Sequence, residues 1–239
     1  NFSKRPPVQS YTQNSKSALF NGMINPLIPY NIKGSIWYQG ENNVARYQEY
    51  ETLFPAMIND WREKWNTDFP FYFVQIAPFR NYNVLSSSLR DVQRKTLKVD
   101  KTGMVVTLDI GDIDDIHPSN KHDVGSRLAG LALHNEYKKT NVASGPLYKR
   151  FEVAENTLII EFDFIGSGLM THDSELSEFE IANANKLFVP AKATIIDNKV
   201  HVRSSRIQKP RYVRYAWKDM SVASLFNKEG LPASSFTTE

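Results

Sequence analysis

Apolar positions in the first 143 residues follow two different periods. Short runs rich in β-branched and aromatic residues are typical of buried strands. These predicted strands occupy residues 34–39, 71–77 and 104–109. Segments with apolar residues three or four positions apart predict helices. These predicted helices cover about 17–28, 47–65, 87–99 and 121–138. Strands that alternate with helices favour an α/β fold, with a parallel sheet and helices on both of its faces.

Two proline-containing segments modify this pattern. Pro55 falls within the predicted helix 47–65, and we expect it to start or kink that helix rather than lie inside it. Residues 1–16 are polar and contain Pro6 and Pro7, so they are expected to form a linker or loop.

The pattern changes near Ser144-Gly145-Pro146. From there to the end, short strand-like runs alternate with turn residues and no amphipathic helix is evident. These runs are 158–162, 178–181, 188–189, 193–196, 200–203 and 212–215. The sequence therefore predicts an α/β part over residues 17–143 and an antiparallel, β-rich region over residues 144–239.

Composition and charge exclude several classes of protein. Of 239 residues, 41% are hydrophobic and 23% charged, as in ordinary globular proteins and unlike disordered ones. A net charge of +3 without a run of Lys or Arg does not predict nucleic-acid binding. No apolar stretch approaches the roughly 20 residues that span a bilayer. The lack of cysteine excludes disulfides, thiolate metal sites and a cysteine nucleophile.

The first segment with candidate chemistry reads Gln-Gly-Glu-Asn-Asn and occupies residues 39–43. It follows the first predicted strand, at the sheet edge where ligands bind in open parallel sheets. A glycine lets a backbone N–H approach a ligand closely, and an asparagine amide can donate to a developing oxyanion. The alternative is a plain strand-to-helix turn, in which Gly and Asn serve the backbone and cap the next helix.

The second segment, residues 109–118, follows the third predicted strand and places four carboxylates within eight residues of His117. A carboxylate that accepts the Nδ1–H of a histidine fixes its tautomer and stabilises the imidazolium. A solvated acidic loop and a divalent-metal site are the alternatives. The spacing matches neither an EF-hand loop nor the H-E-x-x-H zinc motif.

Two further observations bear on this candidate site. Arg90 and Gln93 share one face of the predicted helix 87–99 near the sheet edge, where they either support the site through hydrogen bonds or are solvated. A histidine base with an acid partner and an oxyanion turn needs a nucleophile. Neither G-x-S-x-G nor a Gly-Asp-Ser turn occurs. The residues alone therefore indicate a hydrolase site that lacks one member.

Five segments resemble the sialate O-acetylesterase family of the SGNH hydrolase superfamily. They read IKGSIWYQGENN, FYFVQIAPF, LRDVQRKTL, TGMVVTLDIGDIDDIHPSNKHDVGSRLAGLAL and LFNKEGLPASSF. The resemblance extends from about Ser17 to the C-terminus. It implies a three-layer α/β/α hydrolase domain, incomplete here, followed by a β-rich region. It also implies a carbohydrate esterase that removes O-acetyl groups from sialic acid or related glycans.

The resemblance assigns roles to the histidine loop. His117 matches the catalytic histidine of the family. The superfamily spacing D-x-x-H selects Asp114 as its partner, whereas the family's D-I-H-P motif indicates Asp115. Both stay open, with Asp114 slightly favoured on spacing.

The same resemblance identifies Gln39, Gly40, Glu41, Asn42 and Asn43 as the substrate-binding and oxyanion segment. Gly40 and one asparagine match the oxyanion block. The family spacing selects Asn43 for this role, and the superfamily spacing selects Asn42.

The family's Gly-Gln-Ser-Asn-like serine turn is absent from this sequence. We therefore expect the serine, its strand and any preceding β domain to belong to a missing N-terminal segment, and the isolated chain to be inactive. The expected substrate is an acetylated carbohydrate, with no metal or organic cofactor. The resemblance also implies a secreted or periplasmic protein. An acetylxylan esterase on the same fold and a non-catalytic carbohydrate-binding or structural module are the alternatives.

Overall fold

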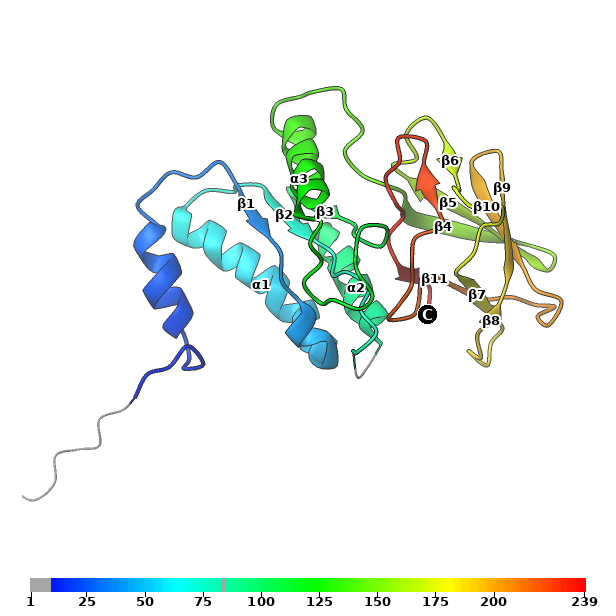
Figure 1. The fold of residues 1–239 in the computed structure, drawn as a ribbon, viewed down its shortest axis with the longest axis horizontal. Helices are drawn as coiled ribbons and strands as arrows, with labels where there is room; N and C mark the ends of the chain where they lie inside the picture. Colours follow the sequence, from blue (N-terminus) through cyan, green and yellow to red (C-terminus); the bar gives the residue numbers. More distant parts are fainter. Residues whose placement is uncertain (1–9, 83–84) are drawn as a thin grey trace, which may run out of the picture.

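The computed structural model describes residues 10–82 and 85–239. Its α/β part is built on a parallel sheet with the strand order β1-β2-β3 (Figure 1). The strands are β1 (Ser35–Trp37), β2 (Phe71–Val74) and β3 (Thr102–Val105). In register, Trp37 lies opposite Phe73, which lies opposite Met104. The predicted parallel pairing of the three strands is confirmed. β1 and β2 are shorter than their apolar runs, and β3 begins two residues before its run and ends at Val105.

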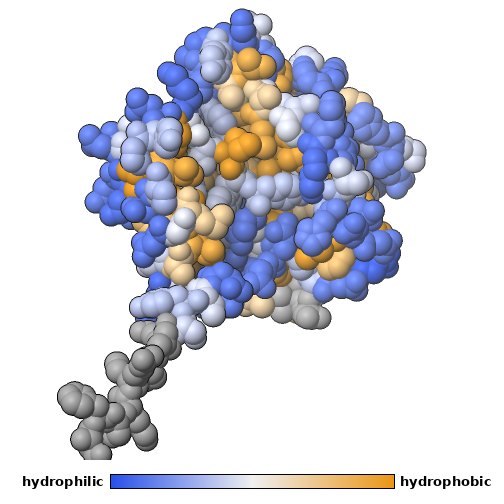
Figure 2. All heavy atoms as spheres, turned by 60° about the vertical axis from the view of Figure 1, so that its left-hand side comes forward, coloured by the Kyte–Doolittle hydropathy of each residue, from blue (hydrophilic) through white to orange (hydrophobic). Residues whose placement is uncertain are grey.

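Helices connect and cover these strands. They are α1 (Tyr47–Trp65), α2 (Ser86–Lys95) and α3 (Lys121–Asn135), with the 3-10 turns η3 (Glu41–Arg46) and η4 (Thr96–Lys98). The predicted helix 17–28 instead forms a π-helical turn, η1 (Phe20–Ile24), and a 3-10 turn, η2 (Asn25–Leu27). Met23 is 65% exposed there. Figure 2 shows apolar side chains on the face of the molecule that carries this N-terminal segment.

Alternate residues of β2 face opposite sides of the sheet. Phe71 and Phe73 pack with Phe54 of α1 and Leu89 of α2. On the other side, Tyr72 and Val74 pack with apolar residues of α3, namely Val124, Leu128 and Leu131. Helices therefore lie on both faces, which explains why all four residues of β2 are buried.

The expectation for Pro55 is wrong, because this residue lies inside α1. A proline inside a helix removes one backbone hydrogen bond and costs about 3 kcal/mol. Phe54 and Ile58 lie on either side of it and are almost completely buried. Burial of such side chains contributes about 1.5–3 kcal/mol each, which offsets the cost of the proline.

The second part consists of strands without a regular helix. They are β4 (Leu147–Ala154), β5 (Thr157–Asp163), β6 (Leu169–Met170), β7 (Phe179–Ala182), β8 (Val189–Pro190), β9 (Lys192–Ile196), β10 (Lys199–Arg203), β11 (Tyr212–Tyr215), β12 (Phe226–Asn227) and β13 (Phe236–Thr237). The sheets have the orders β4-β5-β10-β9, β13-β11-β7-β8 and β12-β6. All pairs described among these strands are antiparallel, as the sequence predicts.

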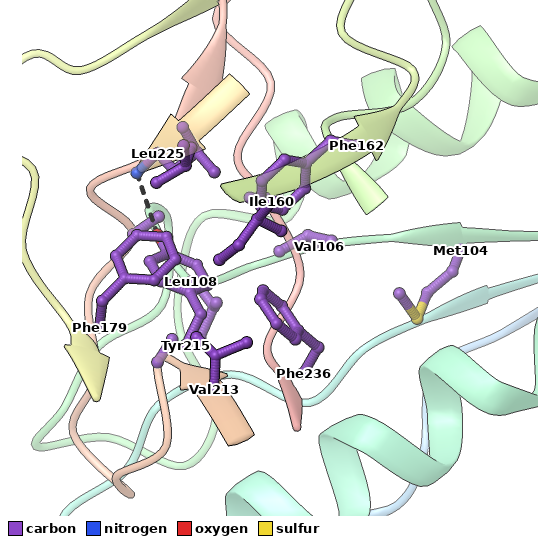
Figure 3. Packing of buried hydrophobic residues seen from close by; sticks show 14 of the residues in the cluster. Met104, Val106, Leu108, Ile160, Phe162, Phe179, Val213, Tyr215, Leu225 and Phe236 are labelled. Atoms are coloured by element: carbon purple, nitrogen blue, oxygen red, sulfur yellow. Dashed lines mark hydrogen bonds between the residues drawn. The ribbon is translucent and has the colours of Figure 1, made fainter. Parts of the chain in front are cut away.

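One hydrophobic core joins the two parts of the chain. Figure 3 shows Val106 and Leu108, which follow β3, packed close to Tyr215 and Phe236 of the β-rich part. The Tyr215 hydroxyl accepts the backbone N–H of Leu225 at 3.0 Å. A domain boundary near residue 144 stays a prediction, because residues on both sides of it share this core.

Within the described residues, no helix is both long enough and apolar enough to cross a membrane.

Candidate active site

The turn after β1 has a geometry that requires glycine. Gly40 is buried and has φ +155°, a conformation that other residues rarely adopt. A Cβ atom at this position would lie 2.9 Å from Cγ2 of Ile76 and 3.1 Å from Nε2 of Gln93. No described residue accepts a hydrogen bond from the Gly40 N–H. A buried, unpaired backbone donor is unusual, and an oxyanion can satisfy it.

The amide side chains of this turn hold each other. Gln39 Nε2 donates to Asn43 Oδ1 at 2.7 Å, and the Asn43 N–H donates to the Gly40 carbonyl, also at 2.7 Å. This leaves Asn43 Nδ2 as a donor that no described residue accepts from. Asn42 is exposed, and Glu41 begins η3. Both asparagines therefore keep an amide donor available, and the choice between them stays open.

The histidine loop after β3 is shaped by its own carboxylates. Asp115 Oδ1 accepts the backbone N–H of His117 at 2.8 Å, and Asp112 Oδ1 accepts the N–H of Asp114 at 2.9 Å. Side-chain bonds of this kind, two residues along the chain, are typical of Asx turns. The His117 side chain is exposed, and no described residue forms a hydrogen bond with its imidazole. The structure thus brings Asp114 and Asp115 into the same loop as His117 without joining either carboxylate to the ring.

Two arginines hold this loop from other elements. Arg80 pairs with the Asp114 carboxylate, and its backbone N–H donates to the Ile113 carbonyl at 2.9 Å. Arg127 of α3 contacts both carboxylate oxygens of Asp109, at 2.8 and 2.5 Å. Asp109 therefore fixes the start of the loop to α3. No three His, Cys, Asp or Glu side chains within residues 10–82 and 85–239 are grouped so that they could hold a metal ion.

The two candidate segments both follow strands at the carboxyl edge of the sheet, and a contact joins residues next to them. Lys121 Nζ, at the start of α3, lies 4.9 Å from the ring centroid of Tyr38, which follows β1. Burial, with a smaller contribution from the Glu41 charge, raises the pKa of Tyr38 to about 12. The phenol is therefore neutral near pH 7 and offers its ring to the ammonium group. Figure 1 shows the loop after β3 at the same end of the sheet as the start of α1.

Arg90 and Gln93 of α2 are both completely buried, so the alternative that these two side chains are solvated is wrong. Arg90 Nε donates to Ser235 Oγ at 2.9 Å, and Nη2 donates to the carbonyls of Ala216 and Lys218 at 3.0 and 2.6 Å. Burial lowers the pKa of Arg90 to about 10, which leaves the guanidinium charged near pH 7. The sequence could not show this burial, because three of the four hydrogen-bond partners of Arg90 lie more than 120 residues along the chain.

Replacing Arg90 with methionine should lower the free energy of unfolding by roughly 3 kcal/mol, because acceptors on four residues, Ser86, Ala216, Lys218 and Ser235, lose their donor. Lys98→Met, at an exposed position in the following turn η4, is the matched control and should change it by less than about 0.5 kcal/mol. Urea denaturation of both variants measures the difference. Equal stability of the two variants would contradict an anchoring role for Arg90.

The chain is similar to several known proteins. The family model for carbohydrate esterases of the sialic acid-specific acetylesterase type matches residues 8–134. The sialate O-acetylesterase of Rattus norvegicus is 28% identical over 255 residues, covering 92% of this chain and 47% of that protein. The sialate O-acetylesterase of Homo sapiens is 33% identical over 171 residues, covering 62% of this chain and 33% of that protein.

A solved structure is also similar. The crystal structure of a carbohydrate acetylesterase from Xanthomonas citri matches with a TM-score of 0.89 and 40% sequence identity. The match covers 92% of this chain and 54% of that one. The chain thus spans about half the length of the rat relative and of this structural neighbour. The resemblance in the motifs is confirmed, and the chain belongs to the carbohydrate esterase family of sialic acid-specific acetylesterases.

Proposed function

We propose that the protein is a carbohydrate O-acetylesterase that acts on sialic acid or related acetylated glycans through a Ser-His-Asp mechanism. The observation that carries the proposal is the unpaired, buried N–H of Gly40 at the same sheet edge as the accessible imidazole of His117. A plain strand-to-helix turn has no need of an unpaired donor, and a binding module has no need of a histidine base.

The serine in this mechanism lies outside the 239 residues. Its hydroxyl attacks the acetyl carbonyl while His117 takes the hydroxyl proton, and the tetrahedral intermediate collapses when the protonated imidazole donates that proton to the leaving sugar oxygen. Water then hydrolyses the acetyl-serine with the same histidine as base. The N–H of Gly40, with the amide of Asn42 or Asn43, donates to the oxyanion in both steps.

We propose Asp114 as the acid that orients His117. Arg80 Nε contacts Oδ1 of Asp114, which leaves Oδ2 for the imidazole Nδ1–H. Asp115 already uses Oδ1 on the backbone N–H of His117 and stabilises the turn instead. The pairing also places the positive charge of the Arg80 guanidinium beside the Asp114 carboxylate.

Residues 17–143 form, in this proposal, the C-terminal portion of a three-layer SGNH-type domain, and residues 144–239 form its β-rich companion. The helices on both faces of the sheet support this assignment. A secreted or periplasmic location stays a prediction from the family resemblance.

Acetate release from defined substrates tests the function. The full-length protein should release acetate from an aryl acetate and faster from O-acetylated sialic acid. The isolated 239-residue chain is the control, and its rate of acetate release should not exceed the rate in water by more than roughly 10³-fold. This is the lower end of the acceleration that sites without a triad member retain. Faster release from acetylated xylo-oligosaccharides would favour the acetylxylan alternative. Sugar binding without acetate release would favour the non-catalytic module.

A further inference from the structure

The buried amide of Gln93 occupies the point where β1 and β2 separate. Its Oε1 accepts the backbone N–H of Ile76 at 2.9 Å. Its Nε2 lies 3.3 Å from the Val74 carbonyl and 3.4 Å from the Gln39 carbonyl. These backbone groups lie at or beyond the ends of the paired segments, so a single side chain replaces ladder hydrogen bonds that the strands no longer make.

The contact with Gln39 also determines the direction of the Gly40 N–H. The Gln39 carbonyl and the Gly40 N–H belong to one planar, trans peptide unit, so they point in opposite directions. Two donors approach that carbonyl from the helix side, Gln93 Nε2 at 3.4 Å and the Tyr50 hydroxyl at 3.3 Å. With the carbonyl held toward α1 and α2, the Gly40 N–H points away from these helices.

Packing supports the same conclusion. A Cβ on Gly40 would lie 3.1 Å from Gln93 Nε2, so the amide lies directly against the glycine. Gln93 is itself held, because α2 is anchored by Arg90 and because Gln75 Nε2 bridges the Arg90 carbonyl and Ser234 Oγ at 2.9 and 2.8 Å. The hydrogen-bonded network therefore extends from the C-terminal segment to the oxyanion turn.

We infer that Gln93 is a positioning residue, which aims the N–H of Gly40 at the substrate oxyanion by holding the carbonyl of Gln39. The inference rests on the proposed function, because it assigns Gln93 a role in the same reaction. Gln93 is completely buried and hydrogen-bonds to the backbone of Gln39, Val74 and Ile76, so its role is exerted through Gly40.

Steady-state kinetics of the full-length protein with an aryl acetate test this role. Gln93→Leu should lower kcat by about 10- to 10³-fold with KM within about threefold, because an oxyanion donor acts mainly in the transition state. Tyr50→Phe removes the second donor to the Gln39 carbonyl and should lower kcat less. Thr96→Val is the matched control, since Thr96 is buried just after α2 but bonds only to the Val92 carbonyl, and its kcat should equal that of the wild type.

Hydrogen exchange measured by mass spectrometry supplies a readout that does not depend on activity. Gln93→Leu should lose protection in the peptide that contains Ile76, and Thr96→Val should not. A Gln93→Leu variant with wild-type kcat overturns the inference. This includes a variant whose kcat/KM falls only because its KM is raised. If Gln93→Leu does not fold, unchanged kcat in Tyr50→Phe overturns it. An inactive wild-type protein refutes the proposed function and the positioning role with it, whereas an active Gln93→Leu variant refutes the positioning role alone.

Discussion

Replacing His117 with alanine should lower kcat of the full-length protein by at least about 10⁴-fold, with little change in the affinity for sugar. The imidazole accepts and returns one proton in the transition states and contributes little to ground-state binding. Acetate release from an O-acetylated sugar gives kcat, and calorimetry with the deacetylated sugar gives the affinity.

His122→Ala is the matched control for this experiment. His122 lies near the start of α3, five residues after His117 in the sequence. Its side chain is 89% exposed, and its Nδ1 lies 3.2 Å from Oδ1 of Asp123. Its removal should leave kcat unchanged. A loss below about tenfold in His117→Ala, equivalent to roughly 1.4 kcal/mol, would exclude His117 as the general base.

Converting Asp114 to asparagine should lower kcat by about 10⁴-fold, because an amide cannot stabilise the imidazolium and favours the wrong tautomer. Asp115→Asn is an internal comparison of the same chemistry in the same loop. The new amide oxygen can still accept the His117 N–H, so we expect little loss of activity. Kinetics of the two variants on the same aryl acetate measure the contrast.

A large loss in Asp115→Asn alone would reverse the assignment. Small losses in both variants would mean that the imidazole is oriented by a backbone carbonyl, by Asp112 or by an acid outside these residues. Either result would leave the role of His117 itself intact, because the two experiments change different groups.

The elements of the fold could be predicted wherever local periodicity and tertiary packing agree. The apolar run 71–77 is buried on both faces and becomes β2, and the helical spacing of 47–65 becomes α1. The prediction was wrong at Pro55, where burial of the neighbouring Phe54 and Ile58 side chains outweighs the cost of a proline inside a helix. Segment 17–28 kept its helical character but formed π and 3-10 turns with exposed apolar residues, because little packs against it.

The candidate site could be predicted as motifs but not as contacts. The turn at Gly40 and the loop of His117 follow strands, and parallel topology places both at one edge. The pairing of Asp114 with Arg80 and of Asp109 with Arg127 joins positions 34 and 18 residues apart, and no spacing rule relates them. The burial of Gln93 could not be predicted from the sequence either, since its partners are backbone groups whose positions only the folded chain defines.

A crystal structure of the full-length protein inactivated by an alkyl phosphonate ester would test the central claim most directly. The phosphonyl oxygen of the serine adduct mimics the tetrahedral oxyanion. We predict that this oxygen lies about 2.7–3.1 Å from the Gly40 nitrogen, with the His117 imidazole within hydrogen-bond reach of the serine oxygen. An adduct whose oxygen contacts neither the Gly40 N–H nor the amides of Asn42 and Asn43, with His117 remote from the serine, would contradict it.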